Sequence, residues 1–171
     1  MIDLAESSSR RRVRAAVPIA CAAFIATSLV AIAQEQGATT AADVIFARKA
    51  LKDDICDKMA SIERTISRGR VDLDEVHAQA DAIAVMLMAF PHLFPPDSNQ
   101  WKPDTDKDPV TATLASPDLW TAFPDFYRQA AAAAKAAFEL SRAGKIDDAR
   151  TRARELRIAC DTCHALYLED Q

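Results

Sequence analysis

A short run near the C-terminal end, Cys160-Asp161-Thr162-Cys163-His164, combines two thiols with an adjacent imidazole. In a C-x-x-C-H run, the thiols form thioether bonds to the two vinyl groups of a haem, and the histidine ligates the iron. The spacing therefore predicts one covalently attached haem c, with Cys160 and Cys163 as attachment residues and His164 as the proximal iron ligand. The rest of the chain is then expected to form a haem pocket.

Two other uses of the paired cysteines are open from the sequence. A thioredoxin-like dithiol would place C-x-x-C at the start of a helix after a strand, where the thiol pKa is lowered, but residues 146–166 are predicted as helix. A structural zinc site would need a second pair of ligands. Outside the N-terminal segment only Cys56, His77 and His92 remain for that purpose, and none has a partner at ligand spacing. A helical bundle without any cofactor would leave the motif without a role.

Four helices are predicted to position this motif. Alanine is abundant, only three glycines occur and β-branched alternation is absent, which favours an all-helical fold. Apolar residues recur every three or four positions in four segments, at about 40–67, 72–90, 116–143 and 146–168. Pro124 lies inside the third segment, so we expect a kink there, or a short first turn followed by a restart. Two short connections and one long crossover, 92–117, predict an antiparallel four-helix bundle.

The same periodicity predicts which residues face inward. On the third helix they are aromatic residues and alanines: Trp120, Phe123, Tyr127, Ala131, Ala134 and Phe138. On the fourth helix, Cys160 and Cys163 share a face with apolar residues. An up-down-up-down order places the end of the fourth helix beside the start of the first, so the haem is expected to face the early turns of the first helix. Cys56 is expected to be a partly buried thiol beside the core, and the crossover is expected to be functional or to pack over something.

The first 33 residues are predicted to be an export signal, separate from the domain at 34–171. Arginines within 10–14 precede an apolar stretch, 15–30, and a small-x-small cleavage site at Ala31-Ile32-Ala33. The apolar stretch is short and alanine-rich for a membrane span, so we expect export to the periplasm without stable membrane insertion after cleavage. Cleavage would remove four arginines and two carboxylates from 21 basic and 25 acidic residues, leaving about six net negative charges. This charge argues against nucleic acid as a partner.

The order of these features resembles that of the class II c-type cytochromes, the group that contains cytochrome c-prime and its low-spin relatives. The resemblance covers nearly the whole mature chain and rests on the position of C-x-x-C-H close to the C-terminus. Three companion segments support it: 44–51 in the first helix, 93–95 after the second and 116–120 at the start of the third. The resemblance implies that Arg48 lies near the haem propionates, although a solvated charge is the alternative, and that a homodimer forms through the first two helices.

Two functions within this family differ in what occupies the sixth coordination position of the haem iron. Low-spin relatives place a methionine about one turn after the arginine, where this chain has Leu51 and Lys52. Met59 lies about 12 Å beyond Leu51 along a helix that rises 1.5 Å per residue, so it is expected to pack in the core, and a shift of register would make it the sixth ligand. Lys52 ligates iron only when neutral, which a long, solvated side chain disfavours. The turn at Leu51 is therefore expected to close the distal side of the haem.

An apolar distal side without a protein ligand admits neutral gases such as nitric oxide and carbon monoxide, because nothing there hydrogen-bonds anions or water. The sequence thus predicts a periplasmic monohaem cytochrome of the c-prime type that carries electrons between periplasmic redox partners, binds these gases, or does both. The alternative is a low-spin electron-transfer cytochrome with methionine as the sixth ligand. Paired carboxylates, a nucleophile with its base and a phosphate-binding glycine loop are not evident, so the protein is not expected to be an enzyme.

Overall fold

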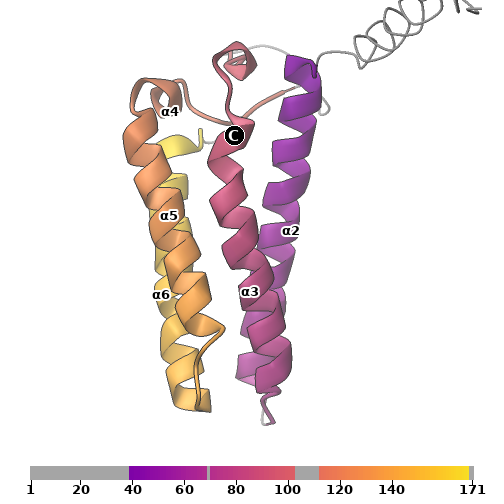
Figure 1. The fold of residues 1–171 in the computed structure, drawn as a ribbon, viewed down its shortest axis with the longest axis vertical. Helices are drawn as coiled ribbons and strands as arrows, with labels where there is room; N and C mark the ends of the chain where they lie inside the picture. The colour runs from indigo at the N-terminus through magenta and orange to yellow at the C-terminus, as the bar shows by residue number, and fades with distance from the viewer. Residues whose placement is uncertain (1–38, 69, 103–111, 170–171) are drawn as a thin grey trace, which may run out of the picture. The chain divides into compact units, whose positions relative to one another are not determined.

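The described part of the chain is an antiparallel helical bundle. The computed structural model describes residues 39–68, 70–102 and 112–169, so the predicted signal segment and its cleavage site at Ala33 lie outside the described residues. The α-helices of the described part are α2 (Ala41–Ser67), α3 (Leu73–Ala89), α4 (Asp118–Thr121), α5 (Phe123–Leu140) and α6 (Ile146–Tyr167). As Figure 1 shows, α3 lies between α2 and α5, and α6 runs alongside α5. The predicted all-α, four-helix bundle is confirmed, with α4 and α5 together forming its third helix.

Side chains that cap the first turns set the starts of α2 and α3. Thr40 and Asp43 form a capping box, in which the Asp43 amide donates to Thr40 Oγ1 at 3.2 Å and the Thr40 amide donates to Asp43 Oδ2 at 2.9 Å. Asp72 Oδ1 accepts from the amides of Asp74 and Glu75 at 3.1 and 3.2 Å. The sequence pattern located both helix starts to within a residue.

The third helix is interrupted at the proline that predicted a break. After the single turn of α4, Ala122 leaves the helical region with φ −108° and ψ 29°, and α5 begins at Phe123 with Pro124 in its first turn. Proline is tolerated there because the amides of a first helical turn have no partner within the helix. The predicted restart is confirmed.

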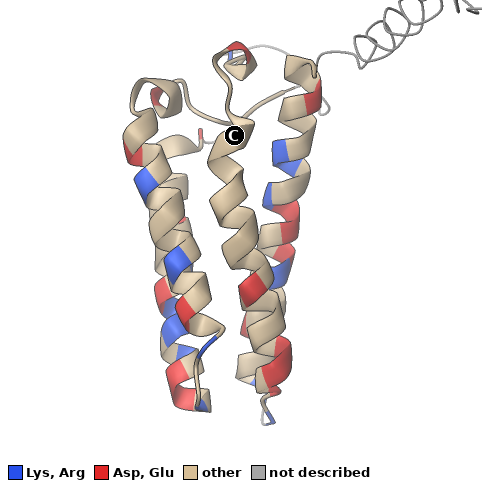
Figure 2. Ribbon diagram, in the orientation of Figure 1, with Lys and Arg blue, Asp and Glu red and all other residues tan. Residues whose placement is uncertain are grey.

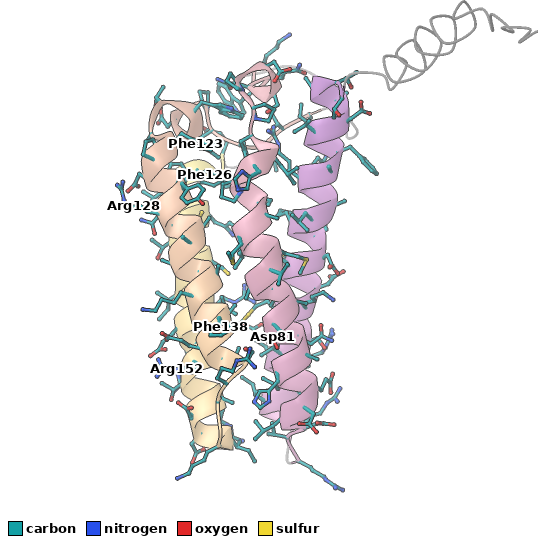
Figure 3. The ribbon with its side chains drawn as sticks, viewed as in Figure 1. Asp81, Phe123, Phe126, Arg128, Phe138 and Arg152 are labelled. Carbon is teal, nitrogen blue, oxygen red and sulfur yellow. The ribbon has the colours of Figure 1, made fainter. Side chains whose placement is uncertain are left out.

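The predicted inner face of the third helix is wrong in part. Tyr127 and Phe138 are 46% and 51% exposed, and in Figure 3 Phe138 lies far along α5 from Phe123 and Phe126. The buried face of α5 is mostly small: Phe126, Ala130, Ala133, Ala134, Ala137 and Leu140. The prediction is wrong because it assigns the largest side chains to the interior. Alanines form most of the buried face instead, and their small size lets α5 lie close to α3 and α6.

Two apolar clusters fill the interior. The larger one spans α2, α3, α5 and α6. Seven of its members form what we call the far-end core: Ile62, Val76, Ala80, Ile83, Ala137, Leu140 and Ala149. The second, the aromatic cluster, consists of Phe94, Leu119, Phe126 and Tyr167 with partly buried neighbours. It lies where α4, the crossover and the end of α6 meet, and so it frames the C-terminal end of α6.

The crossover after α3 is held against the end of α6. It contains two 3₁₀ turns, η2 (Phe90–Leu93) and η3 (Pro96–Ser98). Further on, the Ser116 amide donates to the Tyr167 carbonyl, and the Glu169 amide donates to the Leu114 carbonyl, both at 2.9 Å. These bonds place the segment before α4 beside the haem motif. Within the described residues, no helix combines the length and the apolarity that crossing a membrane requires.

Candidate functional site

A cavity of about 710 Å³ lies at the end of the bundle where α6 finishes. This volume is within the range of about 300–1,000 Å³ that small-molecule sites occupy. The wall is largely apolar and aromatic, with contributions from α2, α3, α5 and the crossover: Ile55, Met59, Leu87, Phe90, Phe94 and Phe126. Cys160, Cys163 and His164 belong to the same wall. The cavity thus lies where the sequence placed the haem pocket, facing the early turns of α2.

The two cysteines of the motif lie on the inner face of α6. Both are half-buried, and burial raises the pKa of the Cys160 thiol and raises that of Cys163 to about 11. A thioredoxin-like dithiol needs the opposite, a lowered pKa at a helix N-terminus. Here the motif occupies the last turns of α6, where the helix dipole disfavours a thiolate. The site gives no support to the dithiol alternative.

His164 belongs to the cavity wall, and the residue is also exposed to solvent. Its pKa is lowered, chiefly because burial disfavours the charged ring; Asp161 opposes the shift, and the charges of Lys52 and Arg157 add to it. This shift favours the neutral form of the imidazole. The neutral imidazole is the form that binds a metal ion.

The zinc alternative lacks its ligands in the part of the chain that the structure describes. No group of three or more His, Cys, Asp or Glu side chains comes together there in a way that would hold a metal ion. His77 Nε2 is 2.9 Å from the Ala143 carbonyl, at the opposite end of the bundle from the cavity. His92 is exposed, and its ring packs against Tyr127. Neither histidine belongs to the cavity wall.

Arg48 is a buried charge in the cavity wall. Its side chain is 3% exposed. Nη1 donates to Ser98 Oγ at 3.0 Å, and Nη2 donates to the Ser98 carbonyl at 3.2 Å and to Thr113 Oγ1 at 2.5 Å. The rings of Phe94 and Trp120 have their centroids 4.7 and 5.5 Å from the guanidinium carbon. No described carboxylate forms an ion pair with this arginine, and burial alone shifts its pKa.

The missing counter-charge indicates what the cavity is built to hold. Burial lowers the pKa of Arg48 to about 10, which corresponds to a desolvation cost on the order of 3 kcal/mol at 1.36 kcal/mol per unit. The guanidinium nevertheless stays charged at neutral pH. A buried cation in an otherwise apolar wall fits a ligand that is largely apolar and carries carboxylates. Haem, an apolar ring with two propionates, has that chemistry, so these residues fit the cofactor and Arg48 is not a solvated charge.

The position expected to close the distal side is occupied by a different residue. Leu51 is not part of the cavity wall; it packs against the larger apolar cluster. Lys52 lines the cavity instead. Because about 3.6 residues make one helical turn, the residue four after Arg48 returns closer to its face than the residue three after it. The expectation for Leu51 is corrected accordingly.

Met59 and Cys56 also border the cavity. Met59 is 2% exposed and belongs to the larger apolar cluster, which agrees with its expected packing role. Cys56 was expected to be partly buried, but it is exposed. It follows Lys52 by one turn and so lies on the same side of α2, whereas its neighbour Ile55 is buried. Ser98 and Thr113 give no signal in the sequence, because their role depends on contact with an arginine 50 and 65 residues away.

Comparison with known proteins agrees with this geometry. Residues 43–167 match the family described as cytochrome c′. Cytochrome c′ from Thermochromatium tepidum is similar over 77% of this chain and 98% of its own, with a TM-score of 0.68 and 22% identity. Cytochrome c prime from Shewanella frigidimarina is similar over 78% and 100%, with a TM-score of 0.65 and 19% identity. Among the curated proteins, none matches this chain.

A third similar structure is the nitric oxide complex of a mutant of cytochrome c prime from Alcaligenes xylosoxidans. It covers 78% of this chain and 100% of its own, with a TM-score of 0.65 and 14% identity. At these identities the solved structures establish a shared fold. The family match covers more than half of the chain, from the first turn of α2 to the last residue of α6. The chain therefore belongs to the cytochrome c′ family of class II c-type cytochromes, whose members carry one covalently bound haem c.

Proposed function

We propose that this protein is an exported monohaem cytochrome that binds small neutral gases at an iron held by His164 and exchanges single electrons. One observation carries the proposal: two thiols, an imidazole and a buried arginine that has no carboxylate partner among the described residues share one largely apolar cavity. Bound haem would supply an iron that changes its redox state by one electron and has a further position for a ligand.

Each residue has a separate part in holding the cofactor. Cys160 and Cys163 would anchor the ring by thioether bonds, and the half-buried setting of both thiols puts them inside the cavity wall. His164 would ligate the iron. Arg48 would pair with a propionate, which would offset the cost of keeping its charge away from water. Its hydrogen bonds to Ser98 and Thr113 hold the guanidinium in place for that contact.

Gas binding is supported by the character of the wall. Apolar and aromatic side chains dominate it, and such a surface disfavours water and leaves neutral diatomics such as nitric oxide and carbon monoxide as suitable occupants. A related cytochrome c prime has been solved as a nitric oxide complex. We infer no catalysed reaction beyond ligand binding and electron exchange.

The setting we propose is the periplasm, with soluble redox proteins as partners. The predicted signal segment supports export, and the charge of the mature chain disfavours nucleic acid. A homodimer through α2 and α3 is part of the proposal. One similar cytochrome c′ is described as having ligand-controlled dimer dissociation, and Phe46 and Val85 on these two helices are 64% and 68% exposed.

The first test is the optical spectrum of the haem-loaded protein with and without carbon monoxide. A ferrous spectrum that shifts on addition of the gas is expected, because the gas would bind the iron that His164 holds. The absence of any shift would overturn gas binding.

Covalent attachment is tested separately by mass spectrometry of protein made with haem-maturation machinery. Replacing Cys160 and Cys163 by serine is expected to abolish the mass increase from haem. The Cys56→Ser variant is the matched control, because this third thiol also borders the cavity but lies outside the motif. It should retain the full haem mass; loss of covalent haem in that variant alone would contradict the assignment.

A second candidate function has one observation in its favour, the presence of Met59 in the cavity wall. With its sulfur as sixth ligand, the protein would be a low-spin electron carrier that binds gases poorly. Met59→Leu tests this alternative, because leucine has a similar volume. Such a substitution typically lowers the free energy of unfolding by less than about 1.5 kcal/mol. Gas binding predicts an unchanged ferric spectrum in this variant. Conversion of a low-spin to a high-spin spectrum would establish the electron-transfer alternative.

A further inference from the structure

One face of α2 lines the cavity along several turns. Arg48, Lys52, Ile55 and Met59 recur at the spacing of one helix face. Arg48 is fixed by its hydrogen bonds to the crossover, and Ile55 and Met59 are buried apolar residues. Lys52 is thus the polar residue of this set that lies, along α2, between the anchored arginine and the two buried apolar residues.

The lysine and the proposed proximal histidine belong to facing helices. His164 lies on α6 and Lys52 on α2, and both side chains line the same cavity. A ligand that occupies the cavity and is bound to His164 on one side therefore presents its other side to α2. On this turn of α2, Lys52 borders the cavity, whereas its neighbour Leu51 packs against the larger apolar cluster.

Among the described residues of the wall, three further side chains are cationic: Arg48, Lys49 and Arg157. Lys49 Nζ donates to the Ala112 carbonyl at 3.5 Å. Arg157 Nε donates to Glu63 at 2.8 Å from the same helix as the histidine, and Arg48 is held by Ser98 and Thr113. Lys52 Nζ lies 2.7 Å from the Asp53 carboxylate, and the two side chains are 43% and 65% exposed. Because an exposed ion pair of this kind stabilises little, the ammonium group can exchange it for a ligand inside the cavity.

We propose that Lys52 is the distal residue of the haem site and that its ammonium group gives the sixth iron position a preference for small anions. This rests on the proposed function, because it requires iron on His164. The ammonium offers three hydrogen-bond donors and a positive charge beside an apolar wall, where the attraction to an anion is stronger than in water. The ligand class is therefore wider than the neutral gases that an apolar turn would select.

The test is titration of the ferric, haem-loaded protein with sodium azide, followed by its optical spectrum. The variants are Lys52→Leu, which removes the charge, and Lys52→Arg, which keeps it. Lys58→Leu is the matched control: this lysine is on the same helix and pairs with Asp54 at 3.6 Å, and it is not part of the cavity wall. We expect Lys52→Leu to weaken azide binding by about tenfold or more. Lys52→Arg should restore most of the affinity, and Lys58→Leu should stay within about twofold of the wild type.

Carbon monoxide binding to the ferrous form is measured on the same variants. A wild-type protein that binds the gas, together with equal azide affinities in Lys52→Leu and Lys58→Leu, would overturn this inference alone. A wild-type protein that fails to bind the gas would overturn the proposed function and the inference with it. A low-spin ferric spectrum without added ligand that becomes high-spin in Lys52→Leu would show that the amine itself ligates the iron, and this too would overturn the preference for anions.

Discussion

The two ends of the bundle are packed differently. At the end away from the motif, the far-end core is closed by protein alone, and Ile62, Val76 and Leu140 are fully buried there. At the other end, the same helices enclose a cavity of about 710 Å³, and the aromatic cluster with a buried arginine forms its frame. Helices that are packed tightly at one end can hold the walls of an open site at the other, which is how a bundle positions a cofactor between its helices.

Charged residues occur at both ends of the bundle, but their placement differs between the helices. In Figure 2, the part of α3 next to the crossover carries no charged residue, whereas acidic and basic side chains alternate along the lower part of α5 and α6. There Arg152 lies 3.1 Å from Glu139 and 3.0 Å from Glu155. These pairs are partly exposed, and each stabilises the fold by at most about 1 kcal/mol. The far end thus relies on packing, with its ion pairs as minor contributors, while the cavity end contains the one charged residue among the described buried side chains, Arg48.

The largest expected effect tests the packing of the far end. Leu140 is fully buried, and Leu140→Ala is expected to lower the free energy of unfolding of the haem-loaded protein by about 2–5 kcal/mol, because a cavity replaces packed atoms. Denaturant unfolding measures this change. Ile158, which is 63% exposed on α6, provides the control, since Ile158→Ala should change stability by no more than about 0.5 kcal/mol. Equal effects of the two substitutions would show that the far end is not the rigid part of the bundle.

A smaller effect on stability is expected when one arginine at each end of the bundle is replaced. Arg48→Leu is expected to destabilise the haem-loaded protein by about 1.5–3 kcal/mol, the range for hydrogen bonds to a charged group. Arg142 is exposed and lies 3.6 Å from Asp81 at the far end, so Arg142→Leu should cost less than about 1 kcal/mol. The measurement is again denaturant unfolding, with the reduction potential as a second readout. An unchanged potential in Arg48→Leu would contradict a contact between this arginine and the propionates.

The features that the sequence predicted correctly are local ones. Helix bounds, the break at Pro124 and the inner face of the motif follow from capping residues and from periodicity within single helices. Contacts between distant segments cannot be recognised from a local pattern. Ser98 and Thr113, for example, accept hydrogen bonds from Arg48, which is 50 and 65 residues away in the sequence. The third and the fourth residue after Arg48 both lie near its face of the helix, with the fourth closer, and the pattern alone does not say which of the two borders the cavity. Only the packed structure selects Lys52 for the cavity.

The smallest effect concerns a hydrogen bond that joins the aromatic cluster to α5. Tyr167 is 7% exposed, and its hydroxyl donates to Asp125 Oδ2 at 2.7 Å. This bond is the main reason that the pKa of Asp125 lies below its usual range, and burial, with the bond to Asp125, raises the pKa of Tyr167 to about 12. Tyr167→Phe keeps the buried ring and removes the bond, so it is expected to lower Tm at neutral pH.

The two pKa shifts predict how the difference in Tm between the wild type and Tyr167→Phe changes with pH. A carboxylate with a lowered pKa stabilises the fold above the ordinary aspartate pKa of about 4, and that contribution is lost as the pH falls through its folded-state value. A phenol with a raised pKa stabilises the fold below its ordinary value of about 10 and ceases to do so as the pH rises towards 12. The difference in Tm between wild type and Tyr167→Phe should therefore be greatest between about pH 5 and 9 and narrow on both sides. Tyr127→Phe, on an exposed face of the same α5, should show no such profile, and a constant difference across the pH range would mean that the variant acts through packing rather than through Asp125.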